Sequence, residues 1–145
     1  MKKALYAAML IAMGSYMAPA SAVIISSTTS LGDLTGSSAS IGNSFGSAAF
    51  GSLFNDVYTF DLTSLSQSVG TTVTFQIALG SNSIGLSNMA ISLTDSALNV
   101  FDSDSQIVSG NTLSVNAVLG SGTGYRFVVT GDVTGNLGGS YGGVV

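Results

Sequence analysis

Residues 125–129 read Tyr-Arg-Phe-Val-Val, and the large apolar side chains of Tyr125, Phe127 and Val129 stand at every second position. Successive side chains of a β-strand point to opposite faces of its sheet, so a period of two predicts a strand with one buried face. Arg126 lies on the other face, where we expect it to reach solvent and pair with an aspartate. The stretch predicts a β-protein.

The same period of two recurs along the chain. It is clear in residues 58–62, 73–79, 89–93 and 113–119, and weaker in 23–26, 98–101 and 141–145. Turn residues separate these windows at 68–70, 80–82, 109–111, 120–124 and 131–139. No window after residue 22 has the 3.6-residue period of a helix. Together they predict an all-β fold, an antiparallel β-sandwich or jelly roll of about seven to nine short strands.

The N-terminal segment has the layout of a secretory signal peptide. Lys2 and Lys3 are followed by a mostly apolar run over residues 4–17 and by the small-residue cleavage site Ala20-Ser21-Ala22. The run is shorter than the roughly 20 residues that a membrane-spanning helix needs. We therefore expect export, with cleavage after Ala22.

The composition excludes several classes of function. The 145 residues contain seven acids, three bases, and no histidine or cysteine, and after residue 22 Arg126 is the only base. A nucleic-acid partner is not expected, because binding a phosphate backbone requires clustered Lys and Arg. A serine nucleophile would lack a base, and the near carboxylate pairs Asp56 with Asp61 and Asp102 with Asp104 are more typical of turns and strand ends than of a glycosidase. We expect no enzyme and no cofactor.

We divide the chain into three parts. Residues 1–22 are the signal peptide, residues 23–52 are a Ser/Gly-rich N-terminal segment with an early strand, and residues 53–145 are the β-sandwich core. Within the second part, residues 29–52 have widely spaced apolar residues and no clear period. We expect there a long irregular connection with at most one further strand.

Residues 102–106, Asp-Ser-Asp-Ser-Gln, resemble the opening of a calcium loop, in which alternate oxygens converge on the cation. The resemblance ends at Ile107 and Leu113, where a helix-loop-helix calcium site requires glycine and a bidentate glutamate. Asp102 and Asp104 are therefore weak calcium candidates. The favoured interpretation is a solvated turn after Phe101, without a metal.

Two longer motifs carry a family resemblance. Residues 54–60, Phe-Asn-Asp-Val-Tyr-Thr-Phe, and the later residues 124–131 and 138–143 resemble the FxDxF family of PEP-CTERM proteins, from about Phe54 onward. Tyr58 stands where the motif has its second phenylalanine. The Pro-Glu-Pro motif, apolar helix and arginine cluster of that family's sorting tail do not occur before Val145, so the sequence is either truncated or belongs to a member released without an anchor.

The resemblance implies an exported protein of a Gram-negative bacterium, secreted or at the cell surface, with a surface or matrix role rather than an activity. For the motif residues Phe54, Asp56, Tyr58 and Phe60 we expect structural roles. The aromatic residues should lie in the core, and Asp56 should accept backbone N–H bonds where its strand begins.

The functional expectations rest mainly on residue types that the chain lacks. Soluble sheet proteins protect exposed edges with lysine, proline or inward-pointing charges, and this chain has neither lysine nor proline after residue 22. Residues 72–79 combine β-propensity with apolar character and no charge, so we expect edge pairing there. The leading hypothesis is a non-enzymatic extracellular-matrix or biofilm structural protein that self-associates. The alternative is an exopolysaccharide-binding module.

Overall fold

The structure is a computed structural model that describes residues 22–63, 67–75, 85–109 and 112–145. The described residues form nine strands: β1 (Ile24–Asp33), β2 (Ser40–Phe45), β3 (Leu53–Leu62), β4 (Gln67–Phe75), β5 (Leu86–Thr94), β6 (Val100–Ser105), β7 (Thr112–Leu119), β8 (Gly122–Val133) and β9 (Gly139–Val144). Two single turns of helix accompany them, η1 (Ser47–Ala49) and α1 (Gln106–Ser109). The predicted all-β fold is confirmed.

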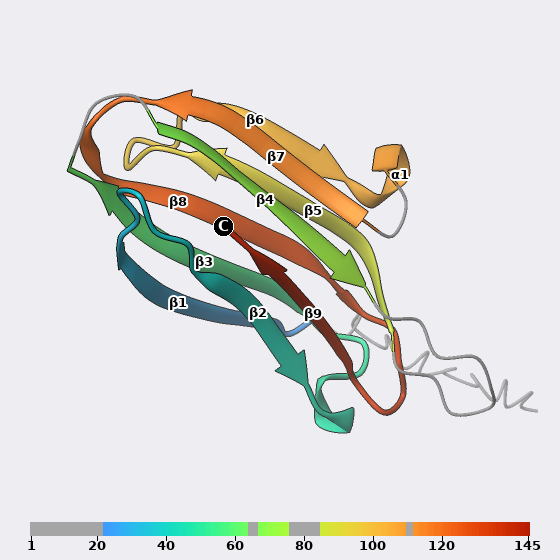
Figure 1. The fold of residues 1–145 in the computed structure, drawn as a ribbon. Coiled ribbons are helices and arrows are strands. Elements are labelled where there is room, and N and C mark those ends of the chain that lie inside the picture. The colour runs from blue at the N-terminus through green and yellow to red at the C-terminus, as the bar shows by residue number, and fades with distance from the viewer. Residues whose placement is uncertain (1–21, 64–66, 76–84, 110–111) are drawn as a thin grey trace, which may run out of the picture.

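The strands form two layers (Figure 1). One sheet has five strands in the order β1-β3-β8-β5-β6, and the other has four in the order β2-β9-β4-β7. Every pairing is antiparallel except that of β1 with β3, which is parallel. The sequence did not predict this exception. It arises because the chain leaves β1, forms β2 in the other sheet and returns to β3, which is the crossover that a parallel pair requires.

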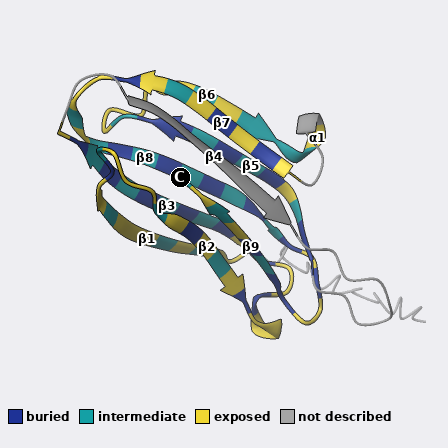
Figure 2. Ribbon diagram, viewed as in Figure 1, coloured by how far each residue is buried: buried dark blue, intermediate teal, exposed yellow. Residues whose placement is uncertain are grey.

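The core lies between the two sheets and follows from the alternation. Along β8 and β3 buried residues alternate with half-buried ones (Figure 2), so each strand turns one row of side chains inward. Tyr125, Phe127 and Val129 face this core as predicted. Arg126 lies on the outer face of β8 and helps to lower the pKa of Asp95, although the main cause of that shift is the side-chain hydrogen bond from Asn99.

Three local expectations differ from the structure. Residues 29–52 contain one further strand, β2, as expected, but they are not mainly an irregular connection, because they also complete β1 and include η1. β1 and β2 are the terminal strands of their sheets. Because β1 buries few side chains, its sequence shows no clear alternation of apolar and polar residues. Residues 68–70 are not a turn but part of β4. The turn expected at residues 120–124 is shorter than predicted, because residues 122–124 already belong to β8 and only residues 120–121 connect β7 in one sheet to β8 in the other.

Several predictions fall on parts of the chain outside the described residues. These are the signal peptide up to residue 21, the continuation of the 73–79 strand past Phe75, the turn at 80–82 and residues 110–111 of the turn at 109–111. They stay predictions.

Candidate functional site: a buried polar network and the two sides of the sandwich

Asp56, the aspartate of the family-like motif, points into the core from the middle of β3 and is 0% exposed. It shares the inner row of this strand with Phe54, Tyr58 and Phe60, all of which are buried. Phe54 stacks on Tyr141 of β9, with ring centroids 5.7 Å apart, and Phe60 stacks on Phe127 of β8 at 5.0 Å. The aromatic motif residues therefore lie in the core, where the alternation placed them.

Asp56 accepts hydrogen bonds from three side chains on three other strands. The Tyr141 hydroxyl donates to Oδ2 at 2.6 Å, the Asn43 amide donates to the same oxygen at 2.9 Å, and the Ser27 hydroxyl donates to Oδ1. Ser27 belongs to β1, Asn43 to β2 and Tyr141 to β9. The carboxyl group thus connects the five-stranded sheet to the four-stranded one.

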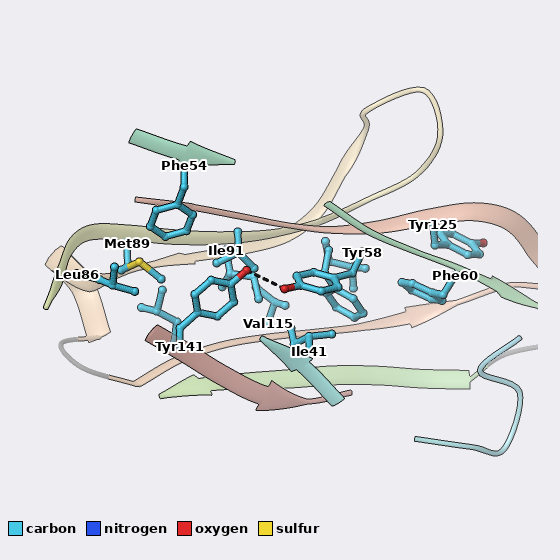
Figure 3. Close-up of a cluster of buried hydrophobic side chains, with 14 of the residues drawn as sticks. Ile41, Phe54, Tyr58, Phe60, Leu86, Met89, Ile91, Val115, Tyr125 and Tyr141 are labelled. Carbon is cyan, nitrogen blue, oxygen red and sulfur yellow. Dashed lines mark hydrogen bonds between the residues drawn. The ribbon is translucent and has the colours of Figure 1, made fainter. Parts of the chain in front are cut away.

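The network continues from Tyr141 to Tyr58 (Figure 3). Because the Tyr141 hydroxyl proton goes to Asp56, the Tyr58 hydroxyl donates to the Tyr141 oxygen, at 2.8 Å. The Tyr58 oxygen in turn accepts the backbone N–H of Gly42 at 3.1 Å. Buried polar groups are tolerated when each finds a partner, and these groups do. We call Ser27, Asn43, Asp56, Tyr58 and Tyr141 the inter-sheet network.

Burial sets the protonation of the two tyrosines. Desolvation raises the pKa of Tyr58 above its ordinary value. Desolvation also raises the pKa of Tyr141, and the hydrogen bond to Asp56 adds to the increase. Both hydroxyls therefore stay protonated in the folded protein at all ordinary pH values.

The expected partners of Asp56 are wrong. Asp56 binds side-chain donors in mid-strand, not backbone amides at the beginning of a strand. Its position on the inner row could be read from the alternation with Phe54 and Tyr58. The partners Ser27, Asn43 and Tyr141 have no local signal, because only the strand order of the folded protein brings them to Asp56.

Asp102 and Asp104 lie in β6, so the solvated turn predicted after Phe101 is wrong. Oδ2 of Asp102 accepts the backbone N–H of Asn116 at 2.7 Å, and Oδ2 of Asp104 accepts that of Ser114 at 2.9 Å. Both amides belong to β7, the last strand of the other sheet. No group of three or more metal-ligating side chains occurs within the described residues. The two carboxylates serve to cap the edge of β7.

The carboxylate pairs considered for glycoside hydrolysis do not form a site. Asp56 and Asp61 occupy opposite rows of β3, because Asp56 faces the core while Oδ1 of Asp61 accepts the backbone N–H of Gly124 at 2.8 Å. Asp102 and Asp104 are occupied by the β7 amides. Neither pair flanks a space in which a glycosidic bond could lie between two carboxyl groups.

The two long sides of the sandwich differ. On one side, β6 and β7 are joined by the carboxylates of Asp102 and Asp104. On the other side, β1 and β2 are the last strands of their sheets, and no described strand pairs with their outer edges. Figure 1 shows β1 and β2 together at this margin of the fold, away from β6 and β7. We call the outer edges of β1 and β2 the open side.

The expectation of edge pairing at residues 72–79 is wrong for the part of that stretch that the structure describes. The described part of residues 72–79 belongs to β4, which lies between β9 and β7 and pairs with both. Residues 72–74 are paired with a strand on each side and therefore have no free edge to offer. Its apolar, uncharged sequence is that of a central strand.

Two shallow grooves lie on the outer face of the five-stranded sheet. One, of about 340 Å³, lies over β5, β6 and β8 and includes Ser92, Ser103 and Thr130 in its lining. The other, of about 330 Å³, lies near the beginning of β1 and β3 and includes Ile24, Leu53 and Asn55. The described residues provide no hydrogen-bond partner for the buried Oδ1 of Asn55.

Comparison with known proteins yields little. No family model and no curated protein matches the chain. One solved structure to which the chain is similar is a periplasmic inhibitor of g-type lysozyme from Aeromonas hydrophila, at 12% sequence identity and a TM-score of 0.40, over 84% of this chain and 97% of that one. In the described residues, no helix is both long and apolar enough to cross a membrane.

Proposed function

We propose that the protein is an exported, non-enzymatic structural protein of the cell surface or extracellular matrix, and that it self-associates through the edges of its sheets. The observation that carries the proposal is the open side of the sandwich. β1 offers ten residues at a free edge, of which only the last, Asp33, is charged, and β2 has no charged residue. Free strand edges of this kind are templates for pairing with another chain.

The chemistry of the described residues supports a non-enzymatic role. Asp56 is enclosed by the inter-sheet network, and Asp102 and Asp104 bind backbone amides. The chain has no histidine or cysteine, and after residue 22 it has no lysine. General acid–base and nucleophilic catalysis depend on such groups with open access to a substrate.

The alternative, exopolysaccharide binding, finds less support. Flat sugar-binding surfaces use exposed aromatic rings. Tyr58, Tyr125 and Tyr141 are all buried. Among the residues whose burial the structure describes, the exposed aromatic rings are Phe50, which directly follows η1, and Phe101 in β6. These two residues do not form one platform, since no described aromatic contact joins them.

The experiment is to recover the chain after export and to measure its mass by sedimentation from micromolar to millimolar concentration. Reversible, concentration-dependent association is expected, without release of reducing sugar from polysaccharides. A chain that stays monomeric throughout this range contradicts self-association. A monomer that is retained on an exopolysaccharide column supports the alternative function instead.

A further inference from the structure

We propose that the partner at the open side is a second copy of this chain, joined by antiparallel pairing of the two β1 strands across a two-fold axis, and that this pairing stops at a dimer. The inference rests on the proposed self-association and names its site and stoichiometry. It predicts a continuous ten-stranded sheet made of two five-stranded ones.

The first step is the direction of the free hydrogen-bonding groups of β1. The carbonyl of Val23 accepts the N–H of Leu53 at 2.9 Å, so the odd-numbered residues turn their backbone groups toward β3. Backbone groups alternate in direction along a strand. The even-numbered residues therefore direct their N–H and C=O groups to the outer edge, where the described residues provide no strand partner. These residues are Ile24, Ser26, Thr28 and Ser30.

The second step is the register. The pairing of β1 with β3 shifts between Ser30 and Gly32, so the regular part of β1 ends at Ser30. An antiparallel self-pairing that uses the whole regular part places its two-fold axis at Ser27. Ile24 then lies opposite Ser30 of the second copy, and Ser26 lies opposite Thr28. In this register the even-numbered residues face one another and exchange about eight backbone hydrogen bonds.

The third step is the absence of repulsion. Residues 24–32 carry no charge, so no like charges meet across the axis. The exposed Ile24, at 63% exposure, would be partly covered by the second copy. Natural sheets often protect an edge with lysine, proline or a short strand, and β1 has none of these over its regular part.

The fourth step is the stoichiometry. An open filament needs two different surfaces that pair head to tail, whereas a two-fold contact uses the same surface twice and closes. On the opposite side of the sandwich, Asp102 and Asp104 extend from β6 onto the amides of β7. Charged side chains turned inward at an edge block the addition of a strand. Pairing of β1 with β1 therefore closes at two copies, and the β6 and β7 side offers no free edge at which further copies could add.

The test uses charge at the two ends of the same sheet. Thr28 of β1 and Ser103 of β6 are both exposed residues of terminal strands. Because an edge pairing buries less than about 1,000 Å² in total, the dimer should be weak and sedimentation should extend to about 1 mM. Thr28→Lys should weaken the dimer at least about tenfold, which is about 1.4 kcal/mol, while Ser103→Lys should leave it unchanged.

A cross-linking experiment tests the register. The chain has no cysteine, so introduced thiols are the only ones present. Opposed residues of a hydrogen-bonded antiparallel pair have Cα atoms about 5.5 Å apart, within disulfide range. The double variant Ser26→Cys/Thr28→Cys should therefore oxidise to a covalent dimer, with residue 26 of each copy joined to residue 28 of the other. The matched double variant Ser103→Cys/Ser105→Cys on β6 should not form a covalent dimer.

The outcomes separate the two proposals. A monomer at every concentration overturns both. Association that Ser103→Lys weakens and Thr28→Lys does not would leave self-association standing and overturn the β1 site. Species that grow beyond two copies would overturn the closed dimer. A dimer that is lost in Thr28→Lys and cross-linked through residues 26 and 28 supports the inference in full.

Discussion

Replacing Asp56 with alanine tests the inter-sheet network most directly. The substitution removes the acceptor for the Tyr141 hydroxyl, which is then left buried without an acceptor because that side chain is only 5% exposed. Such an orphaned donor costs about 1–3 kcal/mol. Ser27 and Asn43 are half-buried and can bind water instead, so they add little. Including the space left by the carboxyl group, we expect a loss of about 2–4 kcal/mol in the free energy of unfolding.

The assay is urea unfolding of Asp56→Ala, Tyr141→Phe and the double variant. Tyr141→Phe should cost about 1–2 kcal/mol, because it removes one donor to Asp56 and the acceptor of Tyr58. The double variant should lose at least about 1 kcal/mol less than the sum, since the two changes remove the same hydrogen bond.

Asp132→Ala serves as the matched control, because Asp132 lies on the outer row of β8 and its carboxylate accepts a hydrogen bond from the exposed Asn88. We expect a change within about 0.5 kcal/mol for this variant. An Asp56→Ala protein as stable as Asp132→Ala would refute the structural role of the network, and strictly additive losses would refute the bond between Asp56 and Tyr141.

Three further predictions follow from particular contacts. Because burial raises the pKa of both network tyrosines, they favour folding below the ordinary value of 10.0, and stability should fall as the pH rises above it, by up to about 1.4 kcal/mol per pH unit for each tyrosine. Urea unfolding from pH 8 to 11.5 checks this, and replacing both tyrosines with phenylalanine should remove the slope. Asp102→Ala with Asp104→Ala uncovers the β7 edge, so light scattering should detect assemblies larger than those of the unmodified chain. Gly138→Ala should lower the free energy of unfolding by more than about 3 kcal/mol in urea, because the new Cβ would lie 1.8 Å from the carbonyl oxygen of Phe45 and residue 138 has a φ of +98°. The control Gly36→Ala should cost about 1–2 kcal/mol, because residue 36 has a φ of +65° but its Cβ would meet no atom within 4 Å.

The alternating windows predicted the interior of the fold well. In β3, β5, β7 and β8 the apolar residues at every second position form the buried rows, because a strand that packs on one face must place its apolar side chains with a period of two. β1 and β2 were poorly predicted for the converse reason. Each lies at the end of a sheet, and β1 in particular buries few side chains, so selection for a buried row is weak there.

The inter-sheet network could be predicted only in part. The inward direction of Asp56 followed from its even spacing with Phe54 and Tyr58, but its donors are 13, 29 and 85 residues away along the chain. Nothing local marks Asn43, Ser27 or Tyr141 as its partners. Residues so far apart meet only after the strand order is established.

The sequence by itself determined the all-β class, the buried rows of the central strands and the scarcity of catalytic groups after residue 22. These properties depend on the periodicity and identity of neighbouring residues, which are local. The tertiary structure alone decided which strands have free edges. Residues 72–75, Thr-Val-Thr-Phe, are uncharged and lie in a central strand, whereas β1, which is uncharged up to Gly32, lies at an open margin. Asp102 and Asp104 cap the other margin. Strand order is set by packing between distant segments, and for this protein that order determines where a second molecule can bind.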